Sequence, residues 1–176
     1  MKKMSLNTRV YMLANKYGLE QNKVHMIITG YIDYCKEMLY QGYRVDILGL
    51  ASLIPNELRE DCMTTLAYEC KYLAEQLKLP SHTVYVIVQE YINSLIDDVL
   101  NGKPIEVRGL FSVVPINDGK QVVKIHSVIS SQVKEHLKER ETFVTSIRIH
   151  THKLLKYKVS NSDRSISIVS EEQENG

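Results

Sequence analysis

The sequence predicts an α+β fold made of two tandem units of the same kind. Residues 41–55 read QGYRVDILGLASLIP and residues 101–115 read NGKPIEVRGLFSVVP, so one pattern of glycines, alternating apolar residues and a final proline occurs twice, 60 positions apart. A stretch with apolar residues at helical spacing precedes each segment. Because the two copies align without a gap, we interpret them as a duplication of a helix–helix–strand unit.

Identical residues run along both copies at this constant offset. They are Leu13 and Leu73, Ala14 and Ala74, Leu19 and Leu79, Val24 and Val84, Ile27 and Ile87, Tyr31 and Tyr91, Gly42 and Gly102, Gly49 and Gly109, Ser52 and Ser112, and Pro55 and Pro115.

Each copy begins with a short and then a long helix. In the first copy the short helix ends at Gly18, and Asn22 is a suitable N-cap for the long one. In the second copy Ser81 has the same capping role. The long helices carry continuous apolar stripes. These are Val24, Ile27, Ile28, Tyr31, Ile32, Cys35, Met38 and Leu39 in the first copy, and Val84, Ile87, Val88, Tyr91, Ile92, Leu95, Val99 and Leu100 in the second.

Four glycines mark the turns that follow the long helices. Gly42 and Gly102 end these helices, and the next residues alternate between apolar and polar as in a half-buried strand. Gly49 and Gly109 interrupt that alternation, which indicates a turn or a close approach of another part of the chain. We therefore predict structural roles for all four, and expect Gly109→Val to impair folding.

The last third of the chain predicts different elements. Asn117-Asp118-Gly119 lies between two apolar runs and predicts a tight, short hairpin. A helix over 128–140 and a strand over 142–149 follow, and 165–169 has the alternation of a strand that could add to a neighbouring sheet. We divide the chain into units 1–60 and 61–127, an extension 128–159 of helix and strand, and a tail 160–176.

Composition and charge exclude several classes of protein. Of the residues, 44% are hydrophobic and 24% are charged, which is typical of a globular protein. No apolar run is long enough to span a membrane, and no secretory signal is present. The net charge is only +1, whereas domains that bind duplex DNA are usually basic. Basic residues are concentrated in 120–158, with nine Lys or Arg against three Glu.

No arrangement of residues predicts catalysis, a metal or a cofactor. His150 and His152 have no carboxylate or thiol at ligand spacing, so we interpret them as surface or packing residues. The three cysteines, Cys35, Cys62 and Cys70, are expected to be reduced. Asp97-Asp98 is interpreted as a solvated helix face. The Tyr-rich composition is typical of protein interfaces.

The ordered motifs resemble the HU/integration-host-factor family of histone-like proteins. Tyr17-Gly18-Leu19 is similar to the first turn of that family, and residues 39–52 to its helix-to-strand passage. Gly109-Leu110-Phe111-Ser112-Val113 repeats the second of these motifs, and residues 151–156 are similar to the closing helix. Members of the family form intertwined dimers, so the resemblance implies a single-chain pseudo-dimer in which the two stripes bury each other. The sequence leaves open whether the copies pair within one chain or between chains.

The chain departs from the family where its members bind DNA. The resemblance implies two long basic β-arms with a proline at the tip, but the first copy ends at Pro55 and the second has only a short hairpin after Pro115. In this it resembles the arm-less HU-like virion proteins of crAss-like tailed phages. That resemblance implies a non-enzymatic structural protein that forms a homo-oligomeric ring between portal and tail. Its partners would be other virion proteins and copies of itself, in the virion and, during assembly, in the host cytoplasm.

The alternative is an architectural DNA-binding protein that uses the basic segment 120–158 in place of the arms. The candidate phosphate contacts are Lys120, Lys124, Arg148, Lys153, Lys156 and Lys158. We favour the structural function. DNA affinity derives mainly from contacts of Lys and Arg with phosphates, and the loss of the arms and the near-neutral charge remove this electrostatic contribution.

Overall fold

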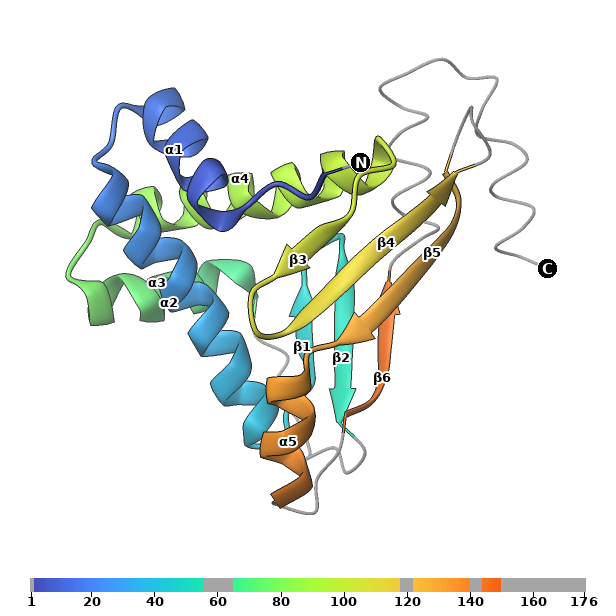
Figure 1. Cartoon of the computed structure of the whole chain (residues 1–176). Helices are drawn as coiled ribbons and strands as arrows, with labels where there is room; N and C mark the ends of the chain where they lie inside the picture. Colours follow the sequence, from blue (N-terminus) through green and yellow to red (C-terminus); the bar gives the residue numbers. More distant parts are fainter. Residues whose placement is uncertain (1, 56–64, 118–121, 140–143, 150–176) are drawn as a thin grey trace.

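A computed structural model describes residues 2–55, 65–117, 122–139 and 144–149. Within these residues the fold is α+β, with five helices and two antiparallel sheets of three strands each (Figure 1). The helices are α1 (Leu6–Tyr17), α2 (Gln21–Tyr40), α3 (Leu66–Leu77), α4 (Ser81–Leu100) and α5 (Ser131–Glu139). The strands are β1 (Val45–Ile47), β2 (Ala51–Pro55), β3 (Ile105–Val107), β4 (Phe111–Asn117), β5 (Val122–Ile129) and β6 (Val144–Ile149).

The internal repeat of the sequence reappears as a repeat of structure. The short helices α1 and α3 both have 12 residues, the long helices α2 and α4 both have 20, and each pair begins 60 positions apart. The pairing of β1 with β2 also matches that of β3 with β4, since Val45 lies opposite Leu53 and Ile105 opposite Val113. Equivalent residues therefore differ by 60 in number throughout both copies.

The helix ends show how local sequence sets these boundaries. Ser5 and Thr65 accept a hydrogen bond from the backbone N–H three residues later, at the start of α1 and α3. Gly18 ends α1 with φ +63°, and the equivalent Lys78 ends α3 with φ +57°. The predicted caps Asn22 and Ser81 were wrong by one or two positions, because both lie in the first turn of their helices.

Each sheet takes its third strand from the C-terminal part of the chain. The orders are β1-β2-β6 and β3-β4-β5, so β6 completes the sheet of the first copy although the whole second copy separates it from β2. We call residues 6–55 with 144–149 the first unit, and residues 66–139 the second unit. The boundaries predicted at residues 60, 127 and 159 stay predictions. However, the pairing of β6 with β2 joins residues 144–149 of the extension 128–159 to the first unit.

The hairpin of the second unit is longer than its sequence indicates. β4 continues through Pro115 to Asn117, so this proline does not end the strand, and β5 pairs with it from Val122 to Ile129. The helix expected from residue 128 begins at Ser131, because Val128 and Ile129 pair with β4. Pairing with a neighbouring strand thus prevails over the local helical pattern.

The two units are related by an approximate two-fold axis. Their long apolar stripes meet in one core, in which every member of both stripes except Met38 is buried. A Cβ added to Gly49 would lie 3.4 Å from Ile96 Cδ1, and one added to Gly109 would lie 2.4 Å from Lys36 Nζ. Because residues 36 and 96 are equivalent, each unit's strand turn contacts the other unit's long helix. Such reciprocal contacts characterise an isologous interface, here within one chain.

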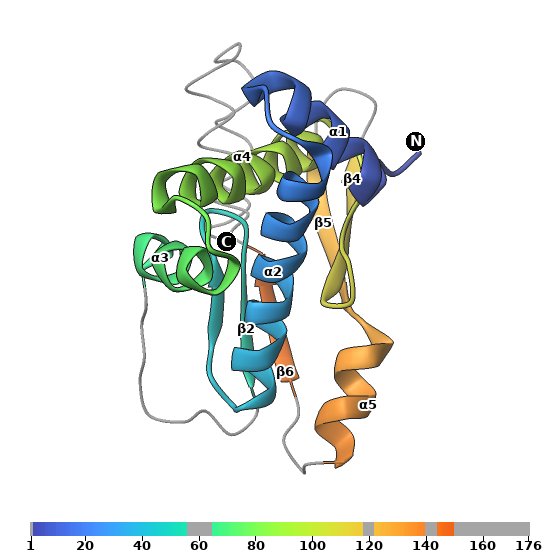
Figure 2. The same cartoon turned by 90° about the vertical axis from the view of Figure 1, so that its left-hand side faces the viewer.

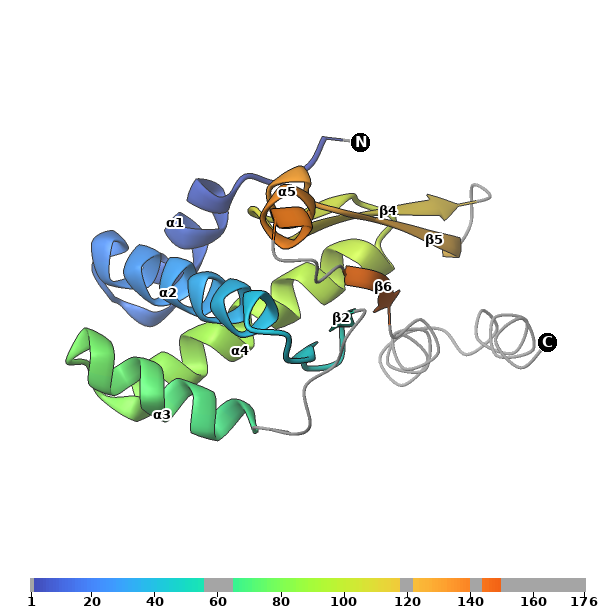
Figure 3. The same ribbon diagram turned by 90° about the horizontal axis from the view of Figure 1, so that it is seen from below.

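The arrangement places helices on one side and strands on the other (Figures 1 and 3). The helix α5 lies beside the C-terminal half of α2 (Figure 2), so a helix of the second unit packs on the first. The ribbon formed by β4 and β5 extends along the strand side (Figure 1), and Val114, Ile116 and Val128 on this ribbon are exposed.

Candidate functional site

The basic residues proposed for DNA contact are only partly placed. Lys124 lies in β5 opposite Ile116, and Arg148 lies in β6 opposite Ser52, so the two belong to different sheets. The candidates Lys120, Lys153, Lys156 and Lys158 lie outside the described residues, as do His150, His152 and Cys62. The structure therefore places only two of the six candidates, and these two lie in different sheets.

The four glycines of the repeated pattern have backbone conformations that other residues rarely adopt. The φ angles are +91° at Gly42, +79° at Gly49, and +78° at both Gly102 and Gly109. L-residues are strained at such values, whereas glycine is not. These conformations place the glycines at turns of the backbone, and the atoms nearest to a Cβ added at Gly109 belong to Lys36 and Gln132. The structural roles of the four glycines stay predictions.

Among the strand residues whose burial the structure describes, the most exposed apolar side chains lie on the outer face of the β4–β5 ribbon. Val114 and Val128 are 50% and 60% exposed, and Ile116 is 40% exposed. Register pairing places Val128 beside Ser112 and Val114 beside His126, so these residues share one face. The opposite face carries buried residues, among them Phe111 and Val113. We call Ser112, Val114, Ile116, His126 and Val128 the ribbon face.

The equivalent face of the first unit carries a polar cluster. Asp46 accepts hydrogen bonds from Ser52 and Arg44, and Arg44 also donates to Ser52 over 3.3 Å. Ser52 is fully buried, whereas Ser112 at the same place in the second unit is partly exposed. Ile54, at the place of Val114, is apolar but only partly exposed, so the described residues of this face are less exposed in the first unit. We did not predict the ribbon-face residues from the sequence, although the alternation of side chains that continues from residue 111 to 116 is a signal for them.

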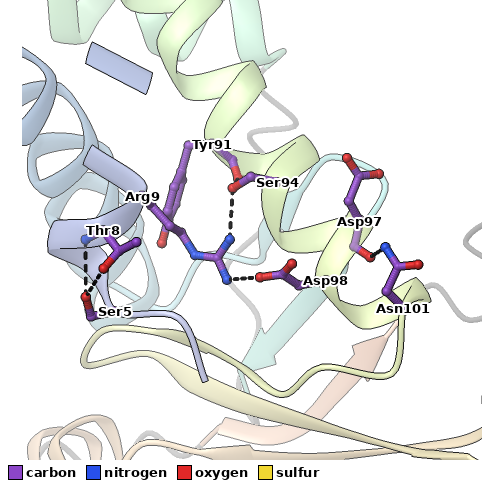
Figure 4. A network of polar contacts seen from close by, with 8 residues as sticks. All are labelled: Ser5, Thr8, Arg9, Tyr91, Ser94, Asp97, Asp98 and Asn101. Atoms are coloured by element: carbon purple, nitrogen blue, oxygen red, sulfur yellow. Dashed lines mark hydrogen bonds and ion pairs between the residues drawn. The ribbon is translucent and has the colours of Figure 1, made fainter. Parts of the chain in front are cut away.

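A buried ion pair joins α1 of the first unit to α4 of the second (Figure 4). Arg9 Nη2 donates to Asp98 Oδ2 over 2.7 Å, and Arg9 Nη1 donates to Ser94 Oγ over 3.1 Å. Arg9 is 3% exposed and Asp98 is 8% exposed. The interpretation of Asp97-Asp98 as a solvated face was therefore wrong for Asp98, while Asp97 is exposed.

Further charges connect the N-terminal residues to the second unit. Lys16 Nζ lies 3.4 Å from Glu90 Oε2, and Lys3 pairs with Glu106 of β3. A cavity of about 260 Å³ lies between α1 and α4, and Arg9, Asp98 and Glu90 contribute to its lining. Burial, followed by the charges of Asp98 and Glu90, raises the pKa of Asp97 beside it. The cavity thus forms part of the contact between the units.

The opposite contact, between α2 and α3, is apolar and aromatic. The rings of Tyr34 and Tyr72 lie 5.8 Å apart. Cys35 and Cys70 are buried here as free thiols, and burial raises both pKa values, that of Cys70 to about 12. Burial also raises the pKa of Tyr31, whose hydroxyl interacts with the neighbouring Cys35 thiol. These inert thiols are packing residues.

The raised thiol pKa values predict that stability decreases at high pH. Unfolded thiols ionise near pH 8.5, whereas the folded protein keeps Cys35 and Cys70 protonated to higher pH. Their contribution is therefore complete below about pH 8.5 and declines above it, by up to about 1.4 kcal/mol per pH unit for each thiol. Urea unfolding at pH 7, 8.5 and 9.5 measures this slope. A Cys35→Ser/Cys70→Ser variant should show a shallower slope, and an equal one would contradict the prediction.

No group of three His, Cys, Asp or Glu side chains suited to a metal occurs among the described residues. None of the helices described there is long and apolar enough to cross a membrane. A scan against models of protein families finds no match for the chain, and a search of curated proteins finds no significant similarity. The surfaces described above are therefore the basis on which a function is proposed.

Proposed function

We propose that this chain is a non-enzymatic assembly protein that binds other proteins through the ribbon face. The observation that carries the proposal is the exposure of Val114, Ile116 and Val128 on one face of a two-stranded ribbon. Contiguous exposed apolar side chains on a sheet mark contact with another protein more often than with nucleic acid. Register places Lys124 opposite Ile116 on this face, and the other members of the ribbon face include no lysine or arginine.

We also propose that the two units are diverged copies of an HU-like unit, with the second inserted into the first. The order of α3, α4, β3, β4 and β5 continues directly into α5, whereas the first unit is interrupted after β2 and resumes at β6. The ribbon of β4 and β5 occupies the place of a DNA-binding arm in the family that the sequence resembles. Its apolar face supports a change from binding DNA to binding protein.

The resemblance to arm-less virion proteins leads to a more specific proposal. We place the chain in a homo-oligomeric ring between portal and tail of a tailed phage, with other virion proteins as neighbours. A ring needs a surface that contacts a different surface on the next copy. The ribbon face suits this requirement, because Val114 is 50% exposed whereas its equivalent Ile54 in the first unit is partly buried.

Substitutions on the ribbon face test the assembly function. Val128→Lys is expected to reduce the oligomer to the monomer of 20.3 kDa, because a charge would be buried without a partner in the contact. The measurement is the mass in solution by light scattering. Leu48→Arg is the matched control, since Leu48 is 59% exposed and its equivalent in the second unit is Arg108. The proposal is wrong if the wild-type chain is monomeric, or if both variants dissociate alike.

A salt titration distinguishes the DNA-binding alternative from the assembly function. Affinity for duplex DNA is measured at about 50 and 200 mM salt, because phosphate contacts make binding strongly salt-dependent. We expect no binding tighter than about 100 µM, the weak end of non-specific binding at physiological salt. Micromolar affinity that falls steeply with salt would instead support the basic segment 120–158 as a DNA contact.

A further inference from the structure

Two similar units in one chain can pair in three ways. The first unit can bind the second, as in this structure, or each unit can bind its own equivalent in another copy of the chain. All three pairings would use the same helix surfaces, because the units are related by an approximate two-fold axis. Discrimination between them must come from positions where the units differ.

The charges at the helix contact differ between the units. Arg9 of α1 faces Ser94 and Asp98 of α4. In the symmetric contact, Glu69 of α3 stands at the place of Arg9, while Tyr34 and Met38 of α2 stand at the places of Ser94 and Asp98. Each of these charges lies near a buried tyrosine of the facing helix. Burial is the larger effect on the pKa of Tyr91, and Arg9 lowers that pKa. At the equivalent Tyr31, Glu69 instead adds to the effect of burial and raises the pKa. Equivalent positions thus carry opposite charges.

Pairing of like units would leave these charges mismatched. If two first units paired, Arg9 would be buried against Met38 and Tyr34 without a carboxylate. If two second units paired, the partly buried Glu69 would face the buried Asp98, and the two acidic groups would repel each other. Only the pairing of unlike units places the arginine opposite the aspartate.

We infer that Arg9 and Asp98 determine the pairing of the two units, so that each unit binds its partner in the same chain and not its equivalent in another copy. A linked pair already has a high effective concentration. The mismatches remove the competing contacts that two similar surfaces would otherwise make between copies. This pairing is independent of whether the assembled chain forms rings or binds DNA.

The test reverses the charge of Asp98. In Asp98→Arg the intrachain contact holds two arginines, while two second units gain an attraction between Glu69 and the new arginine. Asp97→Arg is the matched control, because it makes the same change of charge at an exposed neighbouring position. Arg9→Glu combined with Asp98→Arg restores opposite charges in the intrachain contact and keeps the experiment decisive if the single variant unfolds.

The measurement is a zero-length carbodiimide cross-link between Lys16 and Glu90, whose charged atoms lie 3.4 Å apart. Chains labelled with ¹⁴N and ¹⁵N are refolded together, and mass spectrometry of the cross-linked peptides separates links within a chain from links between chains. For wild type and Asp97→Arg we expect only unmixed peptides. For Asp98→Arg we expect at least a tenfold lower yield of the intrachain link, and for the double variant at least half the wild-type yield.

Two results would overturn the inference. One is a folded Asp98→Arg chain that keeps the wild-type yield of the intrachain link. The other is a double variant that fails to recover the link, which would show that the contact depends on shape and not on charge. Because the link reports contacts between units, both results differ from a failure of the ribbon face, which changes the mass of the oligomer and leaves the link intact.

Discussion

Replacing Gly109 with valine is expected to lower the free energy of unfolding by about 3 kcal/mol. About 1–3 kcal/mol comes from forcing a β-branched residue to φ values near the +78° of this glycine. The remainder comes from Lys36 and Gln132, since Lys36 Nζ and Cε lie 2.4 and 2.7 Å from the position of the new Cβ, and Gln132 Oε1 lies 2.9 Å from it. The ends of these side chains can move, but they then lose their contact with the turn.

Gly18→Val separates the two contributions. Gly18 also has a positive φ, +63°, but an added Cβ would meet nothing within 4 Å. We expect this variant to lose only the strain energy, so it should be more stable than Gly109→Val by about 1 kcal/mol. Lys36→Ala in the Gly109→Val background should recover that difference. Urea unfolding measures all three, and equal losses at the two glycines would show that crowding by Lys36 contributes nothing.

Much of this fold follows from short-range patterns in the sequence. The stripe from Val24 to Leu39 and its equivalent in the second copy predicted the buried faces of α2 and α4, because a helix repeats its face every three to four residues. The glycines were also predictable, since a glycine between two apolar runs already indicates an unusual backbone conformation. Such features depend only on neighbouring residues.

The errors concern features that depend on distant residues. Val128 and Ile129 have a pattern that suits a helix, but β4 is adjacent and offers backbone partners to them. Similarly, nothing near residues 144–149 indicates that they pair with β2, which precedes the entire second unit. Strand pairing of this kind is decided by the assembled core, and a single sequence carries no direct signal for it.

The candidate site was predicted least well, for the same reason. Asp98 was assigned to solvent because it follows another aspartate on a helix, whereas its partner Arg9 lies 89 residues earlier. A signal was nevertheless present, because Arg9 adjoins Val10 and lies one turn before Leu13 on the apolar stripe of α1. A charged residue at such a position needs a partner, although the sequence does not say which one.

Asp98→Met is expected to lower the free energy of unfolding by about 3–5 kcal/mol, because it leaves the Arg9 guanidinium buried without a carboxylate. Methionine is a stringent choice, since Met38 occupies the equivalent position in the first unit and the fold accommodates it there. Asp97→Met, on the exposed neighbour, should change stability by less than about 0.5 kcal/mol.

The double variant Arg9→Met/Asp98→Met distinguishes the cost of an unpaired charge from the value of the pair. Exchanging a buried ion pair for apolar residues of similar size is often neutral or stabilising, so the double variant should be more stable than Asp98→Met alone. Chemical unfolding of wild type, Arg9→Met, Asp98→Met and the double variant completes a double-mutant cycle. If the two losses simply add, the coupling energy is zero, and the unpaired Arg9 is not the source of the penalty. If the double variant recovers stability, the pair contributes little to stability, and its value lies in selecting which units meet.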